Sequence, residues 1–91
     1  MPVEVRLPTM FRGDAAGQAS VKANGGSIGE VLDDLVRQFP RLGGKIVTDE
    51  GTLHRFVNVY CNDEDVRYLD KLDTKLADDD IVTILPAVAG G

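Results

Sequence analysis

Two glycines at the end of the chain, Gly90 and Gly91, offer the least hindered chemistry in the sequence. Because glycine lacks a Cβ atom and adopts nearly all backbone conformations, a Gly-Gly end can thread a narrow enzyme cleft that excludes side chains. The reactive group would then be the α-carboxylate of Gly91. Chain ends are also commonly frayed and rich in glycine, so the pair by itself is a weak signal.

The residues that lead to this pair form a short segment of small side chains, Pro86-Ala87-Val88-Ala89. Together with the two glycines, this segment can extend about 20 Å, far enough to reach a partner's active site. Pro86 restricts its own φ and biases Leu85 toward extended geometry, which directs the segment outward. We therefore expect residues 86–91 to be a flexible C-terminal tail that binds partners, and residues 1–85 to be the folded domain.

The other candidate groups indicate structural roles rather than catalysis. His54 is the only histidine, so a histidine metal cluster is excluded, and a surface or partly packed role is favoured over a general base. Cys61 continues the apolar alternation of a strand, as a buried and inert thiol would. Asp78-Asp79-Asp80 lacks the alternating spacing, glycine and final Glu of a calcium loop. We therefore predict no metal site and no bound cofactor.

Composition limits the protein to one small domain. The chain has 91 residues, of which 43% are apolar and 27% charged, as in ordinary globular proteins. A single cysteine fits a reducing compartment. With no visible secretory signal and no apolar run of about 20 residues, we predict a cytoplasmic location.

The net charge of −5 argues against nucleic acid as a partner, because phosphate binding needs clustered Lys and Arg. Acidic residues gather at Asp33-Asp34, Asp63-Glu64-Asp65 and Asp78-Asp79-Asp80. The first interpretation is that these clusters are solvated turns and faces that aid solubility. The alternative is an acidic surface that steers the protein onto a basic partner.

The elements that must position the tail begin with two strands. Alternating apolar and polar residues predict strands at 3–7 and 18–23, joined by a loop from Pro8 to Gly17. Ser27 and Glu30 form a capping box, and apolar residues at helical spacing then predict an amphipathic helix that ends before Pro40.

The second half of the chain is predicted to return to the sheet. Residues 56–62 alternate as a strand, and 66–69 are expected to form a short returning strand. Residues 41–53 carry no clear pattern. The last strand, 81–85, is nearly all apolar and β-branched, as in a central strand covered on both faces.

One amphipathic helix must cover one face of this sheet to close a core. The order of the elements predicts an α+β protein of the β-grasp (ubiquitin-like) fold, a mixed sheet of four to five strands packed on one main helix. If the first and last strands are parallel neighbours at its centre, the last strand presents the tail directly from the core.

Two segments carry a resemblance that covers essentially the whole chain. They are Leu53-His54-Arg55-Phe56-Val57-Asn58-Val59-Tyr60-Cys61-Asn62-Asp63-Glu64-Asp65-Val66-Arg67 and Ile84-Leu85-Pro86-Ala87-Val88-Ala89-Gly90-Gly91. Both segments, in this order of elements, resemble the ubiquitin-like sulfur-carrier proteins of the ThiS/MoaD/CysO family, with the CysO branch most similar. The loop from Met10 to Gly17 and the insertion from Arg41 to Leu53 depart from the compact ThiS pattern and suit a different set of partners.

The resemblance implies a function for the Gly91 carboxylate. An E1-like enzyme would use ATP to adenylate it, and a sulfur nucleophile would displace AMP to leave a thiocarboxylate. Gly91, with Gly90 allowing close approach, would then donate sulfur to an acceptor synthase, while residues 86–89 dock on the partners. In the CysO branch the acceptor is a PLP-dependent cysteine synthase, and a metalloprotease frees the product. Related carriers serve thiamine, molybdopterin or thiosugar synthases.

In this interpretation the protein is a co-substrate rather than an enzyme, monomeric when free, with no membrane as a partner. Two alternatives remain open. A ubiquitin-like modifier would share the activation chemistry but form isopeptide bonds through Gly91. A passive β-grasp interaction module would leave the Gly-Gly end without a role.

Overall fold

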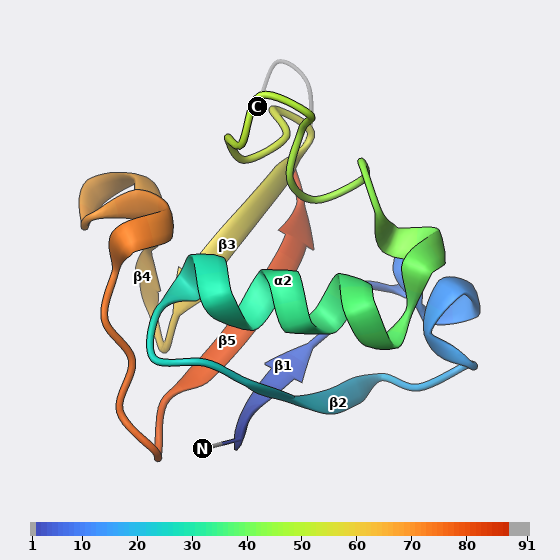
Figure 1. Ribbon diagram of the computed structural model, residues 1–91, viewed down its shortest axis with the longest axis horizontal. Coiled ribbons are helices and arrows are strands. Elements are labelled where there is room, and N and C mark those ends of the chain that lie inside the picture. The colour runs from blue at the N-terminus through green and yellow to red at the C-terminus, as the bar shows by residue number, and fades with distance from the viewer. Residues whose placement is uncertain (1, 88–91) are drawn as a thin grey trace.

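The computed structural model of the protein describes residues 2–87, which build a mixed sheet with strand order β2-β1-β5-β3-β4 (Figure 1). The strands are β1 Pro2–Arg6, β2 Ser20–Asn24, β3 Val57–Cys61, β4 Glu64–Asp65 and β5 Ile81–Pro86. The first and last strands are parallel neighbours at the centre, with Val5 opposite Val82, and every other pair of neighbours is antiparallel. The predicted β-grasp architecture is confirmed.

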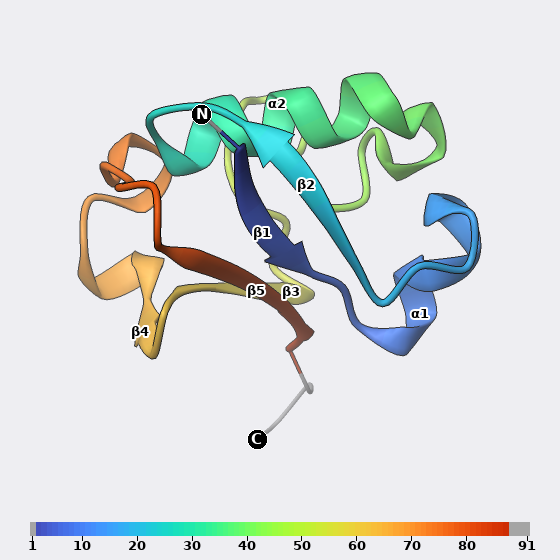
Figure 2. The same cartoon turned by 90° about the horizontal axis from the view of Figure 1, so that it is seen from below.

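The main helix, α2 (Ile28–Gln38), lies across one face of the sheet (Figures 1 and 2). The predicted cap is present in a shifted form. Ser27 Oγ accepts from the Glu30 N–H at 3.3 Å, but Glu30 Oε1 accepts at 2.8 Å from the N–H of Gly26, one residue before the N-cap. The apolar face buries four residues against the sheet, namely Ile28, Val31, Leu32 and Leu35. Within residues 2–87, none of the helices has the length and apolar character that a membrane span requires.

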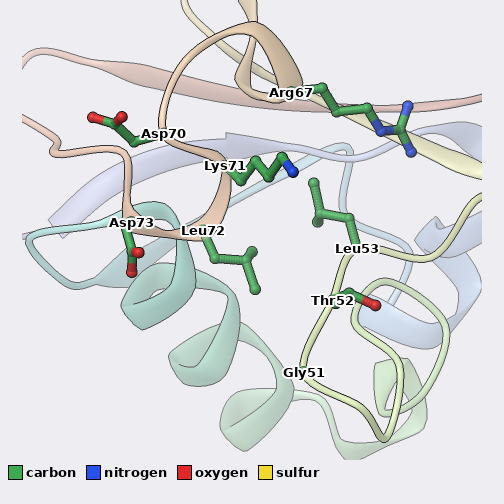
Figure 3. A pocket seen from close by; sticks show the side chains of 8 residues that line it. All are labelled: Gly51, Thr52, Leu53, Arg67, Asp70, Lys71, Leu72 and Asp73. Atoms are coloured by element: carbon green, nitrogen blue, oxygen red, sulfur yellow. The ribbon is translucent and has the colours of Figure 1, made fainter.

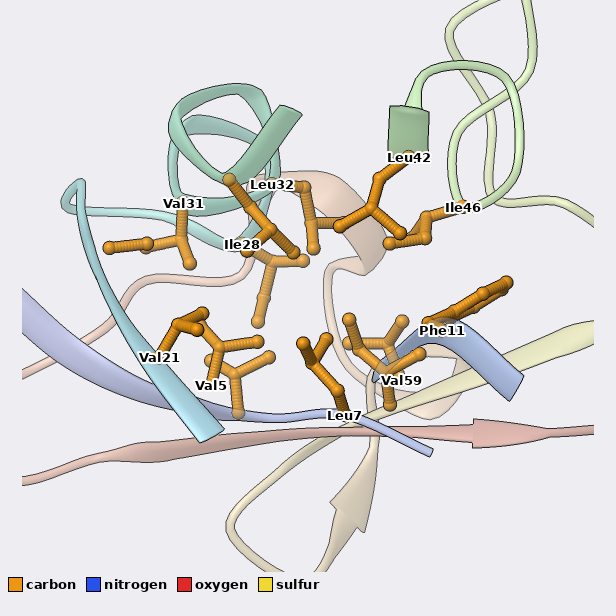
Figure 4. Packing of buried hydrophobic residues seen from close by; sticks show 14 of the residues in the cluster. Val5, Leu7, Phe11, Val21, Ile28, Val31, Leu32, Leu42, Ile46 and Val59 are labelled. Carbon is orange, nitrogen blue, oxygen red and sulfur yellow. The ribbon is translucent and has the colours of Figure 1, made fainter. Parts of the chain in front are cut away.

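The connection between β1 and β2, predicted as a loop, contains a short helix, α1 (Thr9–Arg12), followed by a 3₁₀ turn over Gly13–Ala15. Phe11 from α1 is buried in the same cluster as Leu42 and Ile46 (Figure 4). The loop prediction was wrong because four helical residues are too few to show a 3.6-residue period. The burial of Leu42 and Ile46 also shows that the segment without a pattern, 41–53, completes the core.

The predicted returning strand at 66–69 is also wrong. The strand that returns along β3 is the two-residue β4, and Val66–Tyr68 forms a 3₁₀ turn. Asp65 Oδ1 accepts from the Arg67 N–H at 2.9 Å, which turns the chain away from the sheet. Val66 is buried, whereas Arg67 and Tyr68 are both exposed. The apolar-polar-apolar sequence of the turn imitates a strand, but its burial does not alternate.

β5 is central, as predicted, but only one of its faces is covered. Val82 and Ile84 are fully buried under α2, whereas Ile81 and Thr83 are half-buried and Leu85 is exposed. Figure 2 shows that α2 lies on one side of the sheet and that no described helix covers the other. The open face therefore meets solvent along the strand that leads to the tail.

Candidate functional site

The residues predicted to carry the chemistry, Gly90 and Gly91, lie outside the described residues, as do Val88 and Ala89 of the predicted tail. The structure does describe the base from which these residues continue. That base is the end of β5 and Ala87, and its surroundings determine what a partner meets before it reaches Gly91.

The base of the tail is tied to β3 beyond the point where the tail was expected to begin. Pro86 lies opposite Val57 in the ladder, and the Ala87 N–H donates to the Phe56 carbonyl at 2.8 Å. The strand therefore ends at Pro86, one residue later than predicted, and the Ala87 hydrogen bond extends the contact with β3 by one residue. These contacts hold Pro86 and Ala87 against β3.

Arg67 fixes the strand that holds this base. β4 pairs only with Tyr60 and Cys61 of β3, so it does not reach the first residues of that strand. There the Arg67 guanidinium donates to the Val57 carbonyl at 2.8 Å, to the His54 carbonyl at 3.4 Å and to Asn58 Oδ1. One side chain thus replaces a missing strand neighbour. The sequence analysis assigned no role to Arg67, because its acceptors lie 9 to 13 residues away.

Exposed apolar side chains gather around the same end of the sheet. Met10 is 50% exposed, Phe56 48% and Leu85 43%. Arg55 stacks its guanidinium over the Phe56 ring, 4.9 Å from the centroid. The only other large apolar residue so exposed among those described is Tyr68, at 89%, in the 3₁₀ turn after β4.

A groove of about 530 Å³ runs beside the end of β5. β1 pairs with β5 only as far as Thr83, whereas β5 continues to Pro86, and the chain after β1 turns into α1 (Figure 2). The gap between α1 and the end of β5 is this groove, and Met10, Leu85 and Arg12 are among its lining residues.

His54 is partly packed, as expected, whereas Cys61 is half-buried instead of buried as predicted. His54 Nδ1 accepts from the Phe56 N–H at 3.2 Å, and the two rings lie 5.2 Å apart. Burial raises the pKa of the Cys61 thiol, and the nearby Asp80 and Glu64 carboxylates raise it further. A protonated, half-buried thiol is a poor nucleophile.

Asp80 is held in the turn before β5. Its carboxylate accepts from the Ala77 N–H at 2.8 Å and from Asn62 Nδ2 at 3.0 Å. These hydrogen bonds lower the pKa of Asp80, and the bond from the Ala77 N–H has the larger effect. Within residues 2–87, no group of three or more His, Cys, Asp and Glu side chains is arranged to hold a metal ion.

A second hollow of about 530 Å³ lies between the 51–53 loop and the 3₁₀ turns at 66–68 and 71–73 (Figure 3). Lys71 has a left-handed backbone, with φ at 55°, and its side chain extends toward Leu53 (Figure 3). None of the residues that line this hollow belongs to β5 or to α1.

The chain matches known proteins both in sequence and in structure. The model of the ThiS family matches residues 10–91. The chain is 48% identical over 93 residues to the sulfur carrier protein CysO of Mycobacterium tuberculosis strain H37Rv, with 100% of both chains covered. The crystal structure of the Amycolatopsis orientalis BexX/CysO complex contains a chain that matches with a TM-score of 0.89 at 45% identity, covering 98% of this chain and 99% of that one.

A further relative is the small archaeal modifier protein 3 of Haloferax volcanii, which is 35% identical over 94 residues with 100% of both chains covered. The relatives thus carry names of two kinds, sulfur carrier and modifier. The resemblance drawn from the 53–67 segment and the chain end is confirmed.

Proposed function

The chain belongs to the ThiS family, and from that premise we propose that it is a sulfur carrier whose Gly91 α-carboxylate becomes a thiocarboxylate. The observation that carries the proposal is the 48% identity to a sulfur carrier protein over the whole of both chains. The geometry supports it, because the central strand β5 leads directly to the residues that precede Gly91.

The chemistry needs an activating partner because a carboxylate is a poor electrophile. An E1-like enzyme transfers AMP from ATP to the Gly91 carboxylate and releases pyrophosphate. A sulfur nucleophile then attacks the acyl carbon, AMP leaves, and the chain ends in a thiocarboxylate. Gly90 and Gly91 carry no side chains, so they fit the narrow cleft in which this exchange takes place.

The thiocarboxylate sulfur is nucleophilic yet covalently held, so the carrier delivers it to an acceptor synthase instead of losing it to solvent. The similarity to CysO favours an acceptor that makes cysteine, namely a PLP-dependent synthase followed by a metalloprotease. A thiosugar synthase or another sulfur-inserting enzyme fits the same chemistry. The protein is then a co-substrate of its partners, with residues 86–89 as the segment that they bind.

The test is incubation of the full chain with its purified activating enzyme, ATP and a sulfide source, followed by intact mass measurement. We expect an ATP-dependent product in which one oxygen at Gly91 is replaced by sulfur. A chain that lacks Gly91 is the control and should gain nothing. If the full chain also yields no ATP-dependent product, the proposal is wrong.

The second candidate function is protein modification, which the 35% identity to a small archaeal modifier protein favours. The same mass measurement separates the two functions when target proteins are present. A modifier gives a series of heavier isopeptide conjugates, whereas a carrier gives only the sulfur exchange.

A further inference from the structure

We infer that the groove between α1 and the end of β5 is a docking site for the activating enzyme, which fills it with an apolar side chain beside a carboxylate. This inference rests on the proposed function, because that function requires an enzyme to act on Gly91. It assigns a role to the connection between β1 and β2, where the chain departs from the compact ThiS pattern.

The length of the chain beyond Ala87 places the partner against this end of the body. Four residues follow Ala87, and they span at most about 14 Å when fully extended. An active site that holds Gly91 therefore lies within that distance of the last residue bonded to β3. An enzyme surface around such a site must cover the end of β5 and its neighbours.

The end of β5 offers apolar contact area in the groove. Met10 projects from α1 on one side and Leu85 from β5 on the other, and both line the groove while remaining half exposed. Single exposed apolar residues are ordinary, but these two face one groove from separate elements, so one apolar side chain of a partner can contact both. The unpaired side of β5 from Ile84 to Pro86 forms the floor between them.

The charge in the groove is positive although the chain as a whole is acidic. Arg6 and Arg12 line the groove, and no Asp or Glu is among the described residues that do so. Arg6 is paired with Glu4 at 2.8 Å. Arg12 uses only its Nε to donate to the Leu7 carbonyl at 3.2 Å, and no ion pair within residues 2–87 involves it. The outer amino groups of its guanidinium are available to a partner's carboxylate.

One acidic cluster lies at the start of β5, at the other end of the strand from the groove, so the charge differs between the two ends of β5. Asp78-Asp79-Asp80 directly precedes the first residue of the strand, and Asp80 is bonded to the β3–β4 turn through Asn62. The partner surface that meets the base of the tail is therefore acidic and apolar. A basic partner docked through Asp78-Asp79-Asp80 would face the opposite end of β5 from Ala87.

The experiment compares matched variants as substrates of the activating enzyme. Met10→Ser and Arg12→Gln alter the groove. As controls, Tyr68→Ser replaces an exposed apolar residue and Lys75→Gln an exposed cation with the same polar residues outside the groove. Pyrophosphate release at varied carrier concentration gives KM and kcat. We expect each groove variant to raise KM about tenfold, as at interface residues that carry binding energy, with kcat nearly unchanged and both controls like wild type.

Arg12 also supports the chain after β1 through Leu7, so its variant needs a second measurement. Arg12→Lys keeps the charge and should recover most of the wild-type KM. For the wild type, KM should rise with ionic strength, since salt screens exposed charge pairs. That dependence should be weaker in Arg12→Gln. If Arg12→Gln raised KM only by disturbing the fold, Arg12→Lys would not restore the wild-type KM. The dependence of KM on ionic strength would then be the same in Arg12→Gln as in the wild type.

Direct binding of the full chain to the purified enzyme without ATP tests the docking apart from the chemistry. Wild-type affinity in Met10→Ser and Arg12→Gln would overturn the groove proposal while leaving sulfur transfer intact. A lower KM in these variants would instead indicate that the chain's own residues 88–91 occupy the groove. A wild-type dimer that Met10→Ser dissociates would indicate a second copy. Failure of the proposed function is a different result, absence of any ATP-dependent product from the wild-type chain.

Discussion

At the scale of single residues, the described polar side chains near the strand ends hold turns in place. Asp80 accepts from the Ala77 N–H and from Asn62 Nδ2, and Asn62 Oδ1 accepts from the Ile81 N–H at 3.0 Å. These bonds join the start of β5 to the turn after β3. For Asp80, the interpretation of the acidic cluster as a structural turn is therefore the one that its contacts favour.

The Asp80 contacts predict a pH-dependent contribution to stability. Asp80→Asn turns one acceptor into an NH₂ group that faces a donor, so we expect the free energy of unfolding near neutral pH to fall by about 1 kcal/mol. The folded-state pKa of Asp80 is lowered. Its stabilisation is therefore present above the ordinary Asp pKa and is lost as pH falls through the lowered value.

Urea unfolding between neutral pH and about pH 3 measures this contribution. The difference between wild type and Asp80→Asn should shrink as the pH falls, while the exposed neighbour Asp79→Asn should resemble wild type throughout. A difference that stays constant with pH would contradict the role of the charge.

At the scale of elements, glycines let the turn before α2 lie against the helix. A Cβ added at Gly25 would lie 2.7 Å from the Val31 nitrogen and 2.8 Å from the Glu30 Cβ. At Gly26 the nearest atom is Glu30 Oε1, at 3.5 Å, which is an ordinary contact. Gly29, a helix-weakening residue, has a similar reason: its Cβ would come within 3.2 Å of the Leu72 carbonyl oxygen.

The adjacent glycines give a matched pair of substitutions. Gly25→Ala must displace backbone atoms of the first helical turn, and we expect it to cost about 1–3 kcal/mol of stability, as overpacking does. Gly26→Ala should change stability by less than about 0.5 kcal/mol, as surface changes do. Thermal unfolding of both variants measures the contrast, and equal losses would show that close packing is not why glycine stands at position 25.

At the scale of the whole molecule, the sheet and helix hold the strand from which the tail departs. Leu32 and Leu35 of α2 and Val82 and Ile84 of β5 are fully buried in one core. Figure 4 shows Leu32 within this cluster. β3 then holds the end of β5 through Pro86 and Ala87. If the activating enzyme binds this folded arrangement, a peptide with the tail sequence alone is a poorer substrate than the full chain.

A peptide of residues 86–91 tests this dependence on the body. We expect its kcat/KM with the activating enzyme to fall by more than about tenfold relative to the full chain, since about 1.4 kcal/mol of lost docking energy is a factor of ten. Leu32→Ala is the companion variant. It should lower stability by about 2–5 kcal/mol and reduce activity only at temperatures where the body unfolds. A peptide as active as the full chain would contradict the need for the body.

The sequence by itself determined the elements whose signals are local and repeated. The capping box and helical period of α2, the alternation of β3 and the apolar run of β5 each lie within a dozen residues. Their order led to the β-grasp fold, and the two segments 53–67 and 84–91 led to the family. The Gly-Gly end was found in the same way, and its chemistry remains a proposal.

Only the tertiary structure decided which distant residues meet. Arg67 replaces a strand neighbour for β3, Met10 and Leu85 line one groove, and β5 keeps one face open. None of these follows from spacing, because each contact joins residues that are separated along the chain and approach only after the core has packed. α1 was not predicted for a related reason. Its four residues are too few to show a repeated pattern, and the burial of Phe11 is visible only in the folded structure.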